Sequence, residues 1–304
     1  GVTIALTGAT GFVGQAVLDA AAQREIAIRA LTRRAQKGRG QIEWIEGSLA
    51  DTASLETLAR GTDAVIHVAG LTNSPDPAAF ETANVDGTAH VITAMKAAKC
   101  KRLVFVSSLS AREPDLSAYG ASKLRAEELV QASGLDWTIV RPPGVYGPRD
   151  IDYLEMFRSA KWGFIPLPPR GASSIIHVAD LARLLLDLVD APPALVRRQT
   201  FEPDDGREGG WGHKELAREI GRAMGRRVFA PHLPKPLMLA GARADRLLRG
   251  DKARLTPDRV GYMAHPNWVA RSARRVPPSV WEPHIAGEEG LAQTADWYGR
   301  EGWL

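Results

Sequence analysis

The first fourteen residues place a strand, a glycine-rich turn and a helix in direct succession. Residues 2–7 are apolar and β-branched, which is typical of a strand buried on both faces of a parallel sheet. Gly8, Gly11 and Gly14 follow, and residues 15–23 carry apolar side chains along one side of a predicted helix. The first glycine permits the sharp turn, the second lets a pyrophosphate approach the backbone, and the third lets the helix pack against the strand. This order predicts a phosphate cradle at a helix N-terminus.

A glycine triplet is weak evidence alone, since a tight strand–helix turn that binds nothing can have the same spacing. Residues 7–14, which read Thr-Gly-Ala-Thr-Gly-Phe-Val-Gly, resemble the opening motif of the extended short-chain dehydrogenase/reductase family, which includes nucleotide-sugar epimerases and dehydratases. The resemblance implies that the turn binds a nicotinamide dinucleotide. The implied contacts are made by Gly8, Thr10, Gly11, Phe12, Val13 and Gly14.

Predicted strands alternate with predicted helices over the first half of the chain. Apolar runs predict strands at 26–32, 42–46, 64–70, 103–106 and 137–140, and helices are predicted at 52–59, 78–99 and 119–131. Such alternation predicts an α/β fold with a doubly wound parallel sheet of the Rossmann type.

The pattern changes after residue 147, where proline and glycine become frequent. Residues 174–178 look like a return to the first domain, and beyond residue 201 short helices and turns dominate, with longer helices predicted at 211–225 and 234–249. We therefore predict a dinucleotide-binding domain made of residues 1–147 and 174–200. A smaller, mixed substrate lobe comprises residues 148–173 and 201–304.

Composition excludes several classes of protein. The single cysteine, Cys100, excludes an internal disulfide framework, and the seven histidines show no paired spacing for a metal site. No apolar run approaches the ~20 residues of a membrane span, and no signal peptide is visible, so we expect a cytoplasmic protein.

Charge is unevenly distributed along the chain. The net charge is only +4, but residues 218–275 hold 14 basic and 4 acidic residues. This excess is either a solvated surface or a field that attracts an anionic small-molecule substrate. Nucleic acid is not an expected partner, because no recognised binding motif accompanies the charge.

The second predicted strand ends at Arg33 and Arg34, with no acidic residue beside them. Folds of this type that select NAD usually carry an acid here for the ribose hydroxyls, whereas arginine suits the 2′-phosphate of NADP. We therefore expect NADP(H), and NAD(H) remains open if both arginines point to solvent.

The family resemblance implies further cofactor contacts. The family usually places an aspartate near the adenine after the third strand, and here Ser48 stands in that position. The remaining implied contacts are Leu49, Val68, Ala69, Gly70, Pro142 and Val145. His67 is expected to be a packed strand residue rather than a catalyst.

Tyr119 and Lys123 are four residues apart on a predicted helix and so lie on one face, a turn apart. A nearby ammonium favours the phenolate, so Lys123 is expected to lower the tyrosine pKa from about 10 and make Tyr119 an acid/base. The resemblance implies that Ser108 binds the reacting oxygen, with Ser107 and Ser110 as alternatives, and that Lys123 also holds the nicotinamide ribose.

Substrate contacts are expected at the carboxyl end of the sheet and in the lobe. Thr72 and Asn73 lie in a predicted loop after the fourth strand, and Tyr146 and Arg149 would face the substrate lobe. Asn84 is expected either to order the site or to pack its helix. The resemblance also suggests a homodimer formed through the helices at 78–99 and 118–131.

Three functions are compatible with these features. The first is an NAD(P)(H)-dependent oxidoreductase or epimerase that transfers hydride at a carbinol or carbonyl carbon, with a nucleotide sugar as a candidate substrate; the basic C-terminal segment favours it. The second is an NADPH-dependent ketone or aldehyde reductase, which Arg33 and Arg34 favour. The third is a non-catalytic NADP(H)-binding scaffold or sensor like the complex I accessory subunit, which the intact Ser108, Tyr119 and Lys123 argue against.

Overall fold

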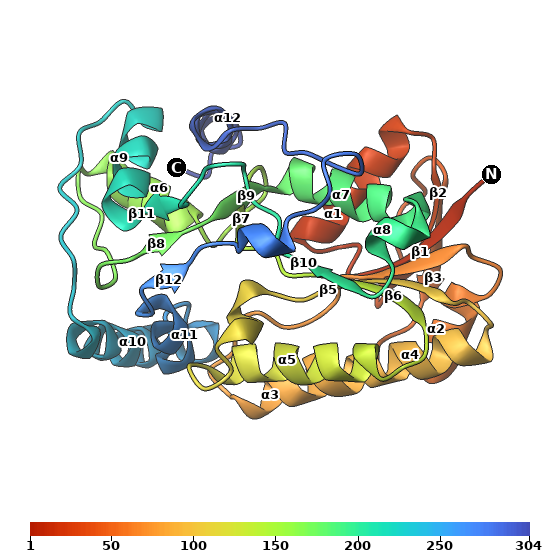
Figure 1. Ribbon diagram of the computed structural model, residues 1–304. Helices are drawn as coiled ribbons and strands as arrows, with labels where there is room; N and C mark the ends of the chain where they lie inside the picture. Colours follow the sequence, from red (N-terminus) through yellow and green to blue (C-terminus); the bar gives the residue numbers. More distant parts are fainter.

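The computed structural model describes residues 1–304 and contains a seven-stranded, wholly parallel sheet (Figure 1). The strand order is β10-β6-β5-β4-β1-β2-β3. The strands are β1 (Thr3–Thr7), β2 (Ala27–Thr32), β3 (Ile42–Glu46), β4 (Ala64–His67), β5 (Arg102–Val106), β6 (Asp136–Val140) and β10 (Gln199–Phe201). The order turns back on either side of β1 and β4, which confirms the predicted doubly wound sheet.

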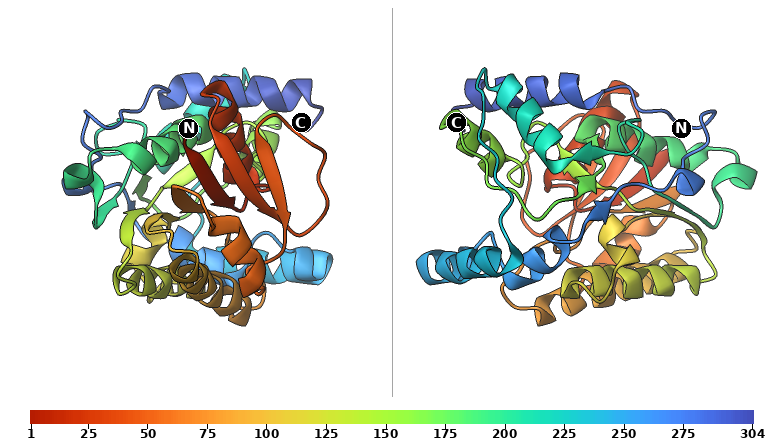
Figure 2. Two further views of the ribbon diagram at one scale, coloured as in Figure 1. Left: turned by 90° about the vertical axis from the view of Figure 1, so that its right-hand side faces the viewer. Right: turned by 60° about the vertical axis from the view of Figure 1, so that its left-hand side comes forward.

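Helices cover both faces of this sheet (Figures 1 and 2). One face carries α1 (Phe12–Gln23) and α7 (Val178–Asp190), and the other carries α2 (Thr52–Ala59), α4 (Gly87–Ala97) and α5 (Ala118–Gln131). Strand β1 shows why both faces need cover, because Ile4 and Leu6 are buried against the first layer and Ala5 against the second. The apolar sequence of β1 thus reflects burial on both sides.

The rest of the chain forms smaller units beside the carboxyl ends of the strands (Figure 1). Two short sheets pair β7 (Gly144–Tyr146) with β9 (Ile175–His177), and β8 (Ala172–Ser173) with both β11 (Trp211–Gly212) and β12 (Asn267–Trp268). One helical layer contains α6 (Leu154–Lys161), α9 (His213–Ala223) and α12 (Gly287–Arg300), which share an apolar core. A separate pair, α10 (Lys235–Arg249) and α11 (Pro257–Met263), lies beside α5. Pro193–Val196 form the short helix α8.

The predicted helix at 78–99 is interrupted. It consists of α3 (Ala78–Phe80), a π-helical turn (Glu81–Asp86) and α4. The Asn84 side chain in that turn accepts a hydrogen bond from the backbone N–H of Leu71 at 2.7 Å and donates to its carbonyl at 2.9 Å. Pattern analysis could not find this distortion because the partner backbone lies in another segment. None of the helices is both long and apolar enough to cross a membrane.

A segment near the C-terminus packs on the dinucleotide-binding domain, although the sequence places it in the lobe. Val276 and Trp281 are buried in the core formed by β1, α1 and α7. The buried Asp180 carboxylate of α7 accepts hydrogen bonds from the backbone N–H groups of His284, at 3.0 Å, and Ile285, at 2.9 Å. A charged acceptor bonded to backbone amides is a strong local tie.

We predict that Asp180→Ala lowers the free energy of unfolding by about 3 kcal/mol, because it removes a buried carboxylate that accepts from two backbone amides and pairs with Arg183. Urea unfolding followed by circular dichroism measures this loss. Asp190→Ala on the same helix is the matched control, since Asp190 is exposed and its loss should cost no more than about 0.5 kcal/mol. Equal losses in the two variants would contradict this role for Asp180.

Candidate active site

A single large cavity of about 1350 Å³ lies at the carboxyl ends of the parallel strands and extends between the dinucleotide-binding domain and the lobe. Ligand sites in proteins usually have volumes of about 300–1,000 Å³, so this cavity has room for two ligands side by side. It is lined by nearly all of the sequence-predicted site residues: Gly8, Thr10, Gly11, Phe12, Val13, Gly14, Arg33, Ser48, Leu49, Val68, Ala69, Gly70, Thr72, Asn73, Ser108, Tyr119, Lys123, Pro142 and Val145. Arg34, Tyr146 and Arg149 are not part of its lining.

The glycine turn is shaped for an anion. Gly8 has φ +74°, and a Cβ there would lie 2.8 Å from the Ala69 nitrogen. A Cβ on Gly14 would lie 1.8 Å from the Gly8 carbonyl oxygen, so the chain itself requires both glycines. Gly11 differs, because a Cβ there would meet only the Gly8 oxygen, at 3.5 Å. Its open side faces the cavity, and no side chain caps α1, so the first amides of the helix remain available to a phosphate. The turn fits a dinucleotide.

A buried chain of side-chain hydrogen bonds lies beneath the cavity. Thr7 Oγ1 accepts from the backbone N–H groups of Val68 and Ala69, both at 3.1 Å, and therefore donates to His67 Nδ1 at 2.6 Å. His67 Nε2 then donates to Thr88 Oγ1 at 3.1 Å, and Thr88 donates to the Asn84 carbonyl at 2.7 Å. Burial lowers the His67 pKa to about 3, so the ring is neutral. The structure places His67 as a packed strand residue.

Helix α5 presents Tyr119 and Lys123 to the cavity. Ser117 caps the helix by accepting a hydrogen bond from the Gly120 N–H at 2.9 Å. Lys123 is buried, its Nζ donates to the Val106 carbonyl at 2.9 Å, and burial lowers its pKa to about 8. Glu127, one turn further along α5, acts in the opposite direction on that pKa.

The expected lowering of the Tyr119 pKa is not found in the structure. Removal of the Tyr119 hydroxyl from water raises its pKa, and the main opposing effect is a hydrogen bond with Ser108. Lys123 is not among the main influences on this pKa, and its ammonium group donates to the Val106 carbonyl. Tyr119 is therefore a neutral phenol here, a form that can donate a proton.

The structure distinguishes the three candidate serines. Ser107 is buried, and its hydroxyl donates to Glu127 Oε2 at 2.5 Å. Ser110 donates to Ser108 Oγ from its backbone N–H at 3.1 Å and from its hydroxyl at 2.9 Å. Since Ser108 Oγ accepts both bonds, its own proton remains free for another acceptor. Ser108 is thus the serine prepared to donate a hydrogen bond beside Tyr119.

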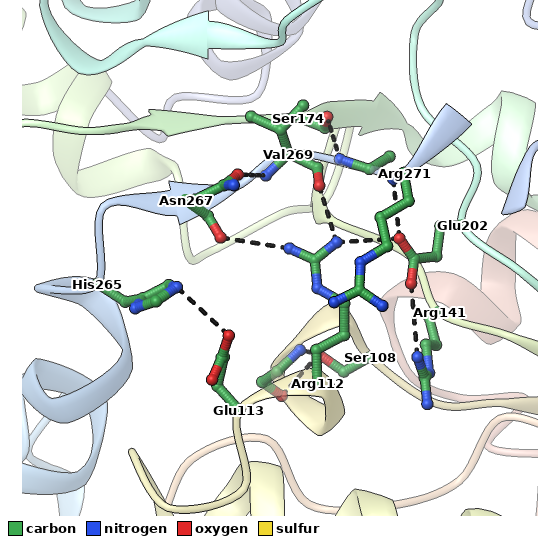
Figure 3. A network of polar contacts seen from close by, with 12 residues as sticks. Ser108, Arg112, Glu113, Arg141, Ser174, Glu202, His265, Asn267, Val269 and Arg271 are labelled. Atoms are coloured by element: carbon green, nitrogen blue, oxygen red, sulfur yellow. Dashed lines mark hydrogen bonds and ion pairs between the residues drawn. The ribbon is translucent and has the colours of Figure 1, made fainter. Parts of the chain in front are cut away.

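A network of polar contacts ties the Ser108 turn to the substrate lobe (Figure 3). Arg112, at the end of the 3₁₀ turn Leu109–Arg112, pairs with the buried Glu202 at 3.0 Å. Arg112 also donates to the carbonyls of Val269, at 2.8 Å, and Asn267, at 3.2 Å, on either side of the cavity-lining Trp268. Sequence analysis missed this network, since its partners are 90 and more residues apart and share no motif.

The lobe side of the cavity is mainly apolar or aromatic. Its lining includes Ile151, Tyr153, Met156, Leu167, Leu216, Leu255, Tyr262, Met263 and Trp268. Both arginines there, Arg254 and Arg259, are paired with Asp152. Of the other two acids in the lining, Glu155 pairs with Arg158, and Asp150 accepts hydrogen bonds from two backbone N–H groups. None of these residues carries a motif that the sequence alone could have identified.

Two predicted substrate residues lie elsewhere. Tyr146 is fully buried in the lobe core, edge-on to His177 with ring centroids 5.4 Å apart. Successive residues of a strand face opposite sides, so Val145 lines the cavity and Tyr146 points away from it. Arg149 forms an ion pair with Asp19 of α1 at 2.9 Å. Neither residue lines this cavity.

Asn73 is placed at the cavity, where it also joins the two parts of the molecule. Its side-chain amide donates to the carbonyls of Ala253, at 3.2 Å, and Arg254, at 3.3 Å. Arg33 lines the other end of the cavity, is exposed, and has no hydrogen-bond or ion-pair partner in the protein. Arg34 follows in a turn held by Thr32, whose hydroxyl donates to the Arg34 carbonyl at 2.6 Å.

The chain is similar to known NAD(P)H-binding proteins and reductases. A family model described as NAD(P)H-binding matches residues 8–192. Ceramide reductase of Caulobacter vibrioides is 35% identical over 314 aligned residues, which cover 99% of this chain and 96% of that protein. The 2-alkyl-3-oxoalkanoate reductase of Stenotrophomonas maltophilia is 29% identical in an alignment that covers 95% of this chain and 97% of that protein.

Solved structures with this fold are more distant in sequence. The crystal structure of gox2253 aligns with a TM-score of 0.79 and 22% identity, covering 100% of this chain and 99% of that one. UDP-glucose 4-epimerase of Thermotoga maritima aligns with a TM-score of 0.70 and 19% identity over both full chains. The NAD(P)H-binding family match, the near full-length relatives and the shared fold show that this chain belongs to the extended short-chain dehydrogenase/reductase family.

Proposed function

We propose that the protein is an NADPH-dependent reductase that converts a ketone on a long-chain, lipid-like molecule into an alcohol. The observation that carries this proposal is the composition of the lobe side of the cavity, where apolar and aromatic side chains adjoin Ser108 and Tyr119. An alkyl chain is stabilised in such surroundings by leaving water, while few polar groups fix its orientation.

The relatives that cover almost the whole chain support the same substrate class. One is named a ceramide reductase and the other a 2-alkyl-3-oxoalkanoate reductase, and both names describe reductases of molecules that carry alkyl chains. A nucleotide sugar would instead require cationic groups for its phosphates. The two lobe arginines that line the cavity, Arg254 and Arg259, are already paired with Asp152.

The chemistry needs one proton donor and one oxygen-binding group. When bound, NADPH supplies the hydride. Ser108 donates a hydrogen bond to the substrate carbonyl oxygen, which stabilises the negative charge that develops there. Tyr119, a neutral phenol, delivers its proton to the same oxygen. Lys123 then lies one turn from the newly formed phenolate and can stabilise it.

Arg33 supports a preference for NADPH over NADH. It follows β2 directly and has no partner within the protein, so its guanidinium is free to bind a 2′-phosphate. Arg34 lies outside the cavity lining.

We predict that Tyr119→Phe lowers kcat for ketone reduction by about 100-fold or more, because the phenol that protonates the oxygen is lost. NADPH binding, followed by fluorescence titration, should be almost unchanged. Tyr262→Phe is the matched control, since Tyr262 also lines the cavity, with its ring centroid 6.2 Å from that of Tyr119. Full turnover by Tyr119→Phe would remove Tyr119 from the mechanism.

We predict that Lys123→Met abolishes turnover but raises the free energy of unfolding at pH 7 by about 1–3 kcal/mol, because a buried charge is removed. The folded-state pKa of Lys123, about 8, is below its unfolded value, so the charged form destabilises the folded state. This destabilisation of the wild type is constant below about pH 8. It decreases as the pH rises from about 8 toward about 10.4, because Lys123 is then neutral in the folded state. The difference in unfolding free energy between Lys123→Met and the wild type, measured by urea unfolding, should therefore decrease over that pH range. A Lys123→Met protein less stable than the wild type at pH 7 would contradict this account.

We predict that Arg33→Ala weakens NADPH binding by roughly tenfold or more while NADH binding changes little, because only NADPH carries the 2′-phosphate. Arg34→Ala is the matched control, because it also removes one positive charge but at a residue outside the cavity lining. It should weaken NADPH binding less than Arg33→Ala does. Isothermal titration calorimetry with NADPH and with NADH measures the ratio of the two dissociation constants for each variant. Equal losses for the two nucleotides would show that Arg33 does not select the cofactor.

A further inference from the structure

Helix α10 has two apolar faces, and only one of them is covered. Met238 and Ala242 are buried and pack with Val260 of α11. A second face, here called the outer stripe, consists of Leu237, Ala240, Gly241, Ala244, Leu247 and Leu248, all exposed to solvent. Leu247 and Leu248 are 87% and 85% exposed.

The outer stripe has helical spacing. Its residues follow one another at intervals of three or four along α10, with adjacent pairs at 240–241 and 247–248, so they lie along one side of the helix. A helix at the surface of a globular protein normally turns charged or polar residues to that side. Figures 1 and 2 show α10 at the edge of the molecule, beside α11.

Basic residues surround the outer stripe. Lys235, Arg243, Arg246 and Arg249 lie on α10, and Lys252 follows it. The two acidic residues nearby are neutralised by ion pairs, Asp245 with Arg249 at 3.0 Å and Asp251 with Arg246 at 3.1 Å. Lys235, Arg243 and Lys252 have no ion-pair partner in the protein, so the helix presents apolar surface within a positive field.

The same end of the molecule carries exposed aromatic residues. Trp162 at the end of α6 is 80% exposed, and Phe229, in the segment between α9 and α10, is 68% exposed. Phe229 packs against Phe164 with ring centroids 5.9 Å apart. Figure 1 shows α6, α9, α10 and the linking segment at its left side. Exposed Trp and Phe side chains are typical of proteins that contact the interfacial region of a bilayer.

We propose that α10 binds the surface of a membrane containing anionic phospholipids, with the outer stripe inserted among the acyl chains. Basic residues beside an apolar stripe match an anionic headgroup layer, which attracts cations and admits leucine side chains beneath it. A second copy of this chain would bring the same unpaired cations together, which opposes self-association through this face. At 15 residues, α10 is too short to span the hydrocarbon core and lies along its surface.

This docking would place the cavity beside the bilayer. Leu255, which follows α10, and Tyr262 and Met263 of α11 line the cavity. The alkyl chain of a lipid leaving the membrane next to α10 would meet these cavity-lining side chains before it reached Tyr119. This second step, delivery of a lipid substrate, rests on the proposed function; the membrane contact itself does not.

Co-sedimentation of the full chain with vesicles tests the contact without cofactor or substrate, so its failure is distinct from failure of the proposed reductase. The probes are vesicles of phosphatidylcholine alone and of equimolar phosphatidylcholine and phosphatidylglycerol. We expect binding to the mixed vesicles that weakens with added salt. Leu247→Ser with Leu248→Ser should lower the partition coefficient on the order of tenfold or more. Lys235→Gln with Arg243→Gln should lower it about fivefold for each charge removed.

Matched controls lie on other parts of the surface. Leu195→Ser on α8 changes an exposed leucine, and Lys96→Gln with Lys101→Gln removes two exposed charges near the end of α4; neither should change vesicle binding. Unchanged NADPH affinity shows that each variant is folded. Wild-type protein that stays in the supernatant with mixed vesicles would overturn the proposal. So would equal losses in the controls, or a dimer, seen by light scattering, that the leucine variant dissociates.

Discussion

The active site depends on the buried hydrogen-bond chain that starts at Thr7. This chain joins the end of β1 to the end of β4 through Thr7 and His67, and then reaches the π-helical turn through Thr88 and Asn84. Asn84 also donates to Ser122 of α5 at 3.0 Å, next in sequence to Lys123. A buried polar group without a hydrogen-bond partner destabilises the folded protein, so this series of hydrogen bonds allows few alternative arrangements of its side chains. It therefore fixes the glycine turn and helix α5 relative to one another.

Most of the nucleotide half of the site could be predicted from the sequence, because its signals are local. Glycine spacing, strand–helix alternation and the Tyr119–Lys123 interval depend on residues a few positions apart. The lobe could not be predicted in this way. Tyr262 and Trp268 reach the cavity only through contacts such as Arg112 with Glu202, which join distant segments. Tyr146 was misplaced because a short strand gives no sign of which of its faces is buried.

The cavity and the surface of α10 suggest the same kind of substrate on separate grounds. The lobe side of the cavity is mainly apolar or aromatic, and both of its arginines are paired with Asp152. The outer stripe is apolar, and a Cβ on its Gly241 would lie 3.5 Å from Leu255, which lines that cavity. A reductase for a water-soluble sugar nucleotide needs neither feature. Both are consistent with a ketone carried on a lipid-like chain, reduced beside the membrane that holds it.

The most direct test of the central claim is to follow deuterium into the product from NADPH that carries deuterium at both hydrogen positions of nicotinamide C4. The protein would be mixed with this cofactor and a long-chain 3-oxoacyl amide, and the product analysed by mass spectrometry. We predict an alcohol that carries one deuterium at the former carbonyl carbon for each NADPH oxidised. An unlabelled product, or interconversion of UDP-glucose and UDP-galactose without net oxidation of the dinucleotide, would contradict the account.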